Sequence, residues 1–270
     1  MKPAFKYIYG PVPSWRLGRS LGIDLLSQRD KVCNFDCVYC QLERTKMYTD
    51  VRKIHVPVEE ILKELSMLPP VKLNYITFSG RGEPTLAANI GDAIRAVKAL
   101  RKEPVAVLTN GSLMDNDRIR EELSLADLVA VKLDAATQKL LQKINRPARS
   151  IELRSIVEGT KEFRHYYQGK LALQIMFLAA NRDQVTELIS LAERIRPDEI
   201  QINTPLRPGG TAPLSRGDIF RIKAAFFYAR ERGELDPGTN IVSVYDEIAL
   251  KDVLSISDDD TLKRRGKVKP

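Results

Sequence analysis

The chain has 270 residues, of which 43% are hydrophobic and 29% are charged, and its formal net charge is +8. This composition is typical of a globular protein with a sizeable core and excludes a disordered chain. No apolar run reaches the roughly 18 residues that a membrane-spanning helix needs, and residues 1–6 lack the apolar core of a secretory signal. We therefore expect a cytoplasmic protein without a membrane partner. The positive charge permits a polyanionic partner.

The elements are predicted from breaker residues and apolar periodicity. Residues 1–20 predict an irregular lead-in, because three prolines and two glycines interrupt any period. Residues 21–26 predict a first strand, directly before the cysteines of the chain. Helical periods predict helices at 58–68, 87–101, 115–123, 150–166, 183–196 and 215–232. Short apolar runs predict further strands at 73–78, 105–109, 128–133, 171–178 and 199–202.

This alternation is typical of an α/β protein with a parallel sheet and helical crossovers. Six βα units suit either an open doubly wound sheet or a partial barrel, and no G-x-G-x-x-G fingerprint opens the first helix. We divide the chain into a lead-in at 1–20, a core at 21–232 and a C-terminal extension at 233–270. In the extension, residues 241–245 are a candidate strand, and the basic residues 263–270 predict a flexible, solvated tail.

All three cysteines of the chain fall within eight residues, at Cys33, Cys37 and Cys40. Three thiolates at this C-x3-C-x2-C spacing can bind three irons of a cubic [4Fe–4S] cluster, which leaves the fourth iron open to a small molecule. Unpaired buried thiols, a zinc site, or a disulfide with one thiol left over are the alternatives. A zinc site needs a fourth ligand, and neither His55 nor His165 belongs to a ligand pair.

The cysteine motif, with Tyr39 just before its last cysteine, resembles the signature of the radical S-adenosylmethionine (radical SAM) superfamily. The segments YGPVPSWRLGRSLGID at 9–24 and CNFDCVYCQL at 33–42 are similar to the branch that contains the 4-demethylwyosine synthase-like enzymes of tRNA wybutosine synthesis. The resemblance extends over residues 9–208. It implies a partial (βα)6 TIM-like barrel that holds a [4Fe–4S] cluster and S-adenosyl-L-methionine (SAM) and receives electrons from a donor such as flavodoxin or ferredoxin.

The resemblance also implies the reaction. A reduced cluster cleaves SAM to methionine and a 5′-deoxyadenosyl radical, which abstracts hydrogen from a substrate, and a tRNA base is one candidate substrate. The wybutosine enzymes carry further cysteines for an auxiliary cluster, and this chain has none. A peptide, a protein or a small molecule is therefore the alternative substrate. A non-enzymatic metal-binding module that binds nucleic acid is the alternative of another class.

In α/β barrels the reacting groups lie at the carboxyl ends of the strands. After the second predicted strand, Gly80 and Gly82 permit a close approach of the backbone, and Glu83 supplies a carboxylate. The stretch is similar to the Gly-Gly-Glu-Pro motif of the superfamily, although Arg81 replaces one glycine. The resemblance implies that Gly80, Gly82, Glu83 and Pro84 bind the amino group of SAM.

Polar residues also occur in and after the later strands. Strand alternation places Lys132 and Asp134 on one face of a strand that is expected to be buried on both faces. Their burial is costly unless they hold a polar ligand, such as the SAM ribose, or pair with each other. The other residues predicted to bind SAM are Tyr39, Asn110, Ser112, Gln174 and Asn203.

Basic residues gather on both sides of the cysteine motif. Lys143 and Arg146 follow the fourth predicted strand, at the rim where a large substrate enters a barrel. Arg16 and Arg19 lie ahead of the cysteines, and we expect them to share that rim. These four residues are the predicted contacts of a nucleic-acid substrate.

Overall fold

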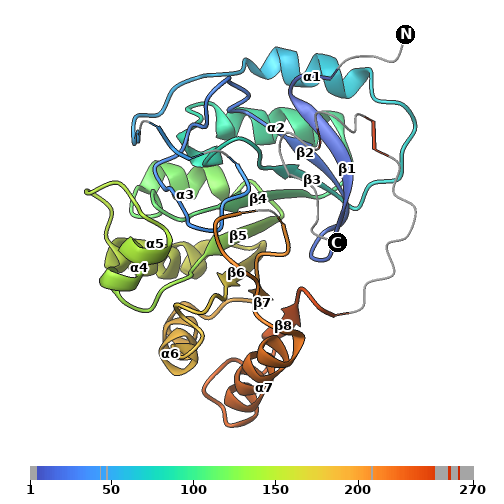
Figure 1. Ribbon diagram of the computed structural model, residues 1–270. Coiled ribbons are helices and arrows are strands. Elements are labelled where there is room, and N and C mark those ends of the chain that lie inside the picture. The colour runs from blue at the N-terminus through green and yellow to red at the C-terminus, as the bar shows by residue number, and fades with distance from the viewer. Residues whose placement is uncertain are drawn as a thin grey trace.

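One curled sheet of eight strands organises the computed structural model, which describes residues 5–42, 44–46, 48–207, 209–246, 255–256 and 261. The strands lie side by side in chain order from β1 to β8, as an open half-barrel with helical crossovers (Figure 1). β1 runs antiparallel to β2, and every later neighbour is parallel. The predicted α/β class and partial barrel are confirmed. No helix among these residues is long and apolar enough to cross a membrane.

The strands are β1 Ile8–Ser14, β2 Gly18–Ile23, β3 Tyr75–Phe78, β4 Val105–Thr109, β5 Leu128–Lys132, β6 Lys170–Met176, β7 Glu199–Asn203 and β8 Asn240–Ser243. The helices are α1 Val58–Ser66, the 3-10 turn η1 Pro84–Leu86, α2 Ile90–Leu100, α3 Asp117–Leu123, α4 Gln138–Ile144, α5 Leu153–Tyr166, α6 Val185–Ile195 and α7 Arg216–Glu231. All six predicted strands and all six predicted helices are present, β4 at its predicted ends and the others with shifted ends. The candidate strand at 241–245 corresponds to β8.

The expectation of an irregular lead-in at 1–20 is wrong, because β1 and the start of β2 form a hairpin there. Two prolines fit in β1 because it is an edge strand, where a missing N–H breaks no ladder bond on its open side. The register shifts between Tyr9 and Val12, around the first of these prolines. β1 and β8 both lie outside the predicted core of 21–232 and belong to the same sheet. The predicted basic tail at 263–270 lies outside the described residues.

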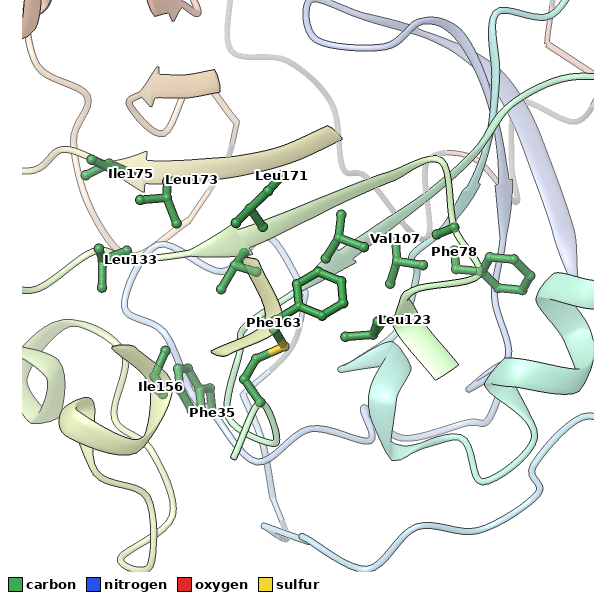
Figure 2. Close-up of a cluster of buried hydrophobic side chains, with 14 of the residues drawn as sticks. Phe35, Phe78, Val107, Leu123, Leu133, Ile156, Phe163, Leu171, Leu173 and Ile175 are labelled. Atoms are coloured by element: carbon green, nitrogen blue, oxygen red, sulfur yellow. The ribbon is translucent and has the colours of Figure 1, made fainter. Parts of the chain in front are cut away.

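The two faces of the sheet carry side chains of different size. Large apolar residues face the helices, and Figure 2 shows Phe163 of α5 in the same cluster as Val107, Leu171 and Leu123. The inner face of the half-barrel carries a small second cluster. Its members are Leu17, Ala106, Leu128, Ala130 and Ala172. The alanines leave space inside the half-barrel, and Leu17 of the β1–β2 turn packs against them at the amino-terminal end of the strands.

A buried carboxylate on α1 holds the start of β1 in place. Glu64 is 6% exposed, and its oxygens accept hydrogen bonds from the backbone N–H groups of Lys6, Tyr7 and Ile8 at 2.7, 2.9 and 2.9 Å. Lys6 and Tyr7 precede β1 and Ile8 is its first residue, so the carboxylate supplies acceptors to backbone donors where the strand begins.

We expect Glu64→Ala to lower the free energy of unfolding by roughly 2–4 kcal/mol, because three N–H groups lose a charged acceptor. Urea unfolding followed by circular dichroism measures the change. Glu59→Ala, an exposed position on the same helix, is the matched control and should change stability by less than about 0.5 kcal/mol. Equal stability of the two variants would show that Glu64 does not hold β1.

Candidate active site

The loop that carries the cysteines lies across the carboxyl ends of the strands, between two segments of backbone. On one side Val32 pairs with Gly82: the Val32 N–H donates to the Arg81 carbonyl at 3.1 Å, and the Glu83 N–H donates to the Val32 carbonyl at 3.0 Å. A Cβ on Gly82 would lie 1.7 Å from the Val32 carbonyl oxygen. Only glycine therefore lets the loop approach this closely.

The other side of the cysteine loop is held by residues 144–148, just after α4. The N–H of Asp36 donates to the Asn145 carbonyl at 3.0 Å, and the N–H of Val38 donates to the Ile144 carbonyl at 2.9 Å. Phe35 anchors the middle of the loop in the main core, in the cluster that contains Ile156 (Figure 2). The three cysteines thus lie on a segment that backbone hydrogen bonds hold on both sides and that Phe35 anchors in the core.

Glu83 is buried, and its carboxylate is fully used inside the protein. It accepts hydrogen bonds from the Thr85 N–H and hydroxyl, the Thr109 hydroxyl and the Asn110 N–H, at 2.6–3.1 Å. Burial raises the pKa of Glu83 above its ordinary value, although these hydrogen bonds oppose the shift. The Asn110 amide donates to Asn34 Oδ1 at 2.8 Å, and Asn34 Nδ2 donates to Ser112 Oγ at 2.7 Å. Glu83, Asn110 and Ser112 therefore connect the ends of β3 and β4 to the cysteine loop.

Lys132 and Asp134 pair with each other, at 3.5 Å between Nζ and Oδ1. The Asp134 carboxylate also accepts from Asn145 Nδ2 at 2.7 Å, from the Met176 N–H at 2.8 Å and from the Tyr39 hydroxyl. Of the two alternatives for this pair, the geometry matches the internal ion pair. Burial and the Asp134 charge raise the pKa of Tyr39 well above its usual range, so its hydroxyl stays a donor and ties the last turn of the loop to Asp134.

The surroundings of the thiols fit a negatively charged iron–sulfur cluster. The Phe35 N–H donates to Cys33 Sγ at 3.4 Å, and Asn145 Nδ2 donates to Cys37 Sγ at 3.5 Å. Burial acts to lower the pKa of the Lys31 ammonium, but the charges of the three cysteines and of Asp36 outweigh it, and the pKa is raised. A buried cation and N–H donors to sulfur are what stabilise thiolates bound to iron.

The arrangement differs from a site for one metal ion. Among the residues that the structure describes, no three His, Cys, Asp or Glu side chains group as the ligands of a single ion. In a cubic cluster each thiolate binds a different iron, so its three sulfurs do not converge on one point. Burial raises the pKa of the Cys33 thiol, and it raises that of Cys37 to about 11, so binding of a cluster must displace protons from these thiols.

A cavity of about 590 Å³ opens beside the loop and runs into the half-barrel, a size typical of small-molecule sites. Cys40 and Tyr39 lie at the carboxyl ends of the strands. Trp15 and Arg16 belong to the β1–β2 turn, which lies at the opposite end of β2 because Ser14 pairs with Gly18. The predicted site residues that line the cavity are Arg16, Tyr39, Cys40, Gly80, Gly82, Gln174 and Asn203. The predicted SAM contacts that do not line it are Glu83, Pro84, Asn110, Ser112, Lys132 and Asp134.

The structure does not bring the four predicted substrate arginines and lysines together, and the expectation of one shared rim is wrong. Arg19 lies at the amino end of β2, where its backbone N–H donates to Asn74 Oδ1 at 2.8 Å. Lys143 is exposed on α4, and the Arg146 guanidinium lies 3.8 Å from the Asp36 carboxylate. The cause is the β1–β2 hairpin, whose turn points away from the cysteine loop. Only Arg16 reaches the cavity.

The sequence reasoning missed three residues that the structure places here. Asn34 and Asn145 hold the loop, and Trp15 lines the cavity. Trp15 had a usable signal, because it is the only tryptophan of the chain. Arg207, at the end of the irregular segment after β7, lines the same cavity.

Comparison with known proteins identifies relatives of this chain in sequence and in fold. The family model described as the radical SAM superfamily matches residues 31–192. UPF0026 protein slr1464 of Synechocystis is 44% identical over 218 residues, which are 80% of each chain. UPF0026 protein MJ1312 of Methanocaldococcus jannaschii is 36% identical over 74% of this chain and 64% of its own. These names do not single out the wybutosine branch.

A solved structure has the same fold. Streptococcus suis SuiB bound to S-adenosylmethionine superposes with a TM-score of 0.61 at 16% identity. The match covers 82% of this chain and 49% of SuiB, so this chain spans about half the length of that protein. The likeness confirms the partial barrel.

We expect Gly82→Ala to loosen the cysteine loop. The added Cβ overlaps the Val32 carbonyl, and overpacking of this kind costs about 1–3 kcal/mol. Amide hydrogen exchange in residues 31–37, measured by mass spectrometry, should become roughly tenfold faster or more.

Gly217→Ala is the matched control, because a Cβ there meets its nearest atom at 3.8 Å, and exchange in residues 31–37 should not change. Unchanged exchange in both variants would mean that the contact with Val32 does not position the loop.

Proposed function

The chain belongs to the radical SAM superfamily, and from this premise we propose that Cys33, Cys37 and Cys40 bind three irons of a [4Fe–4S] cluster whose fourth iron binds SAM. The cluster and SAM are the cofactors of the family, and the protein is an iron–sulfur enzyme. When bound, they supply one-electron cleavage of the C5′–S bond of SAM, which gives methionine and a 5′-deoxyadenosyl radical that takes hydrogen from a substrate. The observation that carries the proposal is the three-cysteine loop, which backbone hydrogen bonds hold on both sides and whose Cys40 lines the cavity.

Within this proposal the chain's own residues have two kinds of role. Gly80, Gly82, Gln174 and Asn203 line the cavity next to Cys40 and bind SAM directly. The other predicted SAM residues act through the loop: Glu83, Pro84, Asn110 and Ser112 fix its first half, and Tyr39, Lys132 and Asp134 fix its last turn. Gln174 supports the first role, because its Nε2 is buried and has no acceptor among the described residues.

A reductant must reach the cluster, as in the family generally. We propose a small one-electron donor such as flavodoxin or ferredoxin. The exposed Arg44 and the half-exposed Arg146 flank Asp36 on the cysteine loop, and this positive edge suits a donor of negative charge.

A tRNA base is one candidate substrate, and it would place the protein in the wybutosine-type branch. The net charge of +8 supports it, as do Lys143 and Arg146 beside the loop. Both residues lie outside the cavity, so they would contact the backbone of a bound nucleic acid.

Replacing any one of Cys33, Cys37 and Cys40 by Ala should abolish the cluster, because two thiolates do not hold the cube. Iron and sulfide are measured per chain after anaerobic reconstitution, with about four irons expected in the wild type. With a chemical reductant and SAM, the wild type should form 5′-deoxyadenosine and the variants should not. Ser27→Ala, a partly exposed control ahead of the loop, should retain both. Full iron content in the three cysteine variants would end the proposal.

For tRNA, binding should fall steeply with salt, because each neutralised phosphate contributes about 0.9 to the slope of log K against log salt. The double variant Lys143→Glu and Arg146→Glu should bind more weakly with a smaller slope. Filter binding between 50 and 200 mM salt, roughly the range in which such effects are large, measures both. A flat salt response, or equal binding by the double variant, would remove tRNA as the substrate.

A further inference from the structure

The cavity that Cys40 and the proposed SAM contacts line is also lined by two arginines and the only tryptophan of the chain. We propose that Arg16 and Arg207 bind an anionic group of the substrate, a carboxylate or a phosphate of a small molecule, inside this cavity. This inference deepens the proposed function and rests on it.

Arg16 is held in the cavity by the packing of its neighbour. Leu17 is 3% exposed and packs against the inner-face alanines Ala130 and Ala172, which fixes the β1–β2 turn inside the half-barrel. Ser14 supports the same turn, because its hydroxyl accepts the N–H of Leu17 at 3.2 Å. The Arg16 side chain therefore enters the cavity from a rigid turn, and Trp15 beside it places its ring 5.5 Å from the guanidinium carbon.

The charge of Arg16 has no acceptor among the described residues. Its Nε is buried without a hydrogen-bond partner, and the guanidinium makes no ion pair within the part of the chain that the structure describes. Burial and the nearby Arg207 lower the pKa of Arg16 to about 10, with Glu199 acting the other way, so the group remains a cation at neutral pH. A cation in such a place is costly unless something binds it.

The described acids nearest to Arg16 are occupied by other partners. Glu199 pairs with Lys170 at 2.6 Å and accepts from Asn240 at 2.9 Å. Asp246, which lines the cavity, pairs with Lys223 at 2.7 Å and accepts the Ser243 N–H at 2.8 Å. Neither of these two carboxylates pairs with Arg16.

Arg207 adds a second guanidinium from the loop after β7, and both arginines line the same cavity. Their like charges repel, and an anion between them converts repulsion into two attractions. Guanidinium groups match carboxylate and phosphate oxygens with paired N–H donors. Because Arg16 Nε is buried, a small molecule reaches it more readily than the backbone of a nucleic acid.

The test is calorimetric titration of inorganic pyrophosphate and of malonate, at constant ionic strength, into the cluster-loaded protein with SAM. At least one probe should bind saturably to the wild type. If only pyrophosphate binds, the anionic group is a phosphate, and if only malonate binds, it is a carboxylate. Arg16→Gln should weaken that binding about ten- to hundredfold, as expected for a lost charged hydrogen bond. Arg19→Gln, with the same charge change on the same hairpin but outside the cavity, should bind as the wild type does.

Thermal unfolding without any probe provides a second measurement. Arg16→Gln should unfold at the same or a higher temperature than the wild type, because it removes an unpaired buried charge, whereas loss of a structural arginine would lower that temperature. Binding of neither probe, equal binding by Arg16→Gln, or a loss of SAM affinity in Arg16→Gln would overturn the inference. The titrations are repeated on the protein as purified, so that failure of cluster loading counts against the proposed function alone.

Discussion

The pairing of Val32 with the backbone of residues 81–83 is the contact on which the site depends. It brings the loop after β2 onto the end of β3, and it exists because residue 82 has no side chain. Glu83, next in the chain, then gathers Thr85, Thr109 and Asn110 around one buried carboxylate. This one carboxylate satisfies four donors, so it joins the ends of β3 and β4 next to the cysteine loop. The pairing of Val32 then fixes the loop on this end of the sheet.

The buried polar residues of the half-barrel fall into two groups. Asp134 has a full set of donors, and residues of this kind fix the scaffold. Arg16 and Gln174 carry buried nitrogen atoms without an acceptor among the described residues, and both face the cavity. A protein that leaves a buried donor unpaired loses stability, and such groups are expected where a ligand completes the bonding. Arg16 and Gln174 differ from the other described residues with an unpartnered buried atom, such as Asn145 and Gln201, in that both line the cavity.

Much of the fold could be predicted from the sequence, because apolar periodicity reports which segments are buried. Strand β4 was predicted at its observed ends, and the motif at 33–40 indicated the site. The β1–β2 hairpin was missed because prolines read as breakers, whereas an edge strand tolerates them. The sequence shows that Glu83 and Ser112 are polar, and not that they accept hydrogen bonds from Asn110 and Asn34. Arg19 and Arg16 are three residues apart, and only the direction of the turn decides which one enters the cavity.

The direction of that turn also orders the proposed reactants along the cavity. The cysteines lie at the carboxyl ends of the strands, and Arg16 enters from the amino ends. In the proposed arrangement SAM lies next to Cys40, and Arg16 reaches the anionic group of the substrate from the amino side, with Arg207 of the loop after β7 on the same group. The uncharged part of the substrate then faces SAM, where hydrogen is removed. Small residues on the inner face, Ala130 and Ala172 among them, make this possible, because larger side chains would fill the space between the two sites.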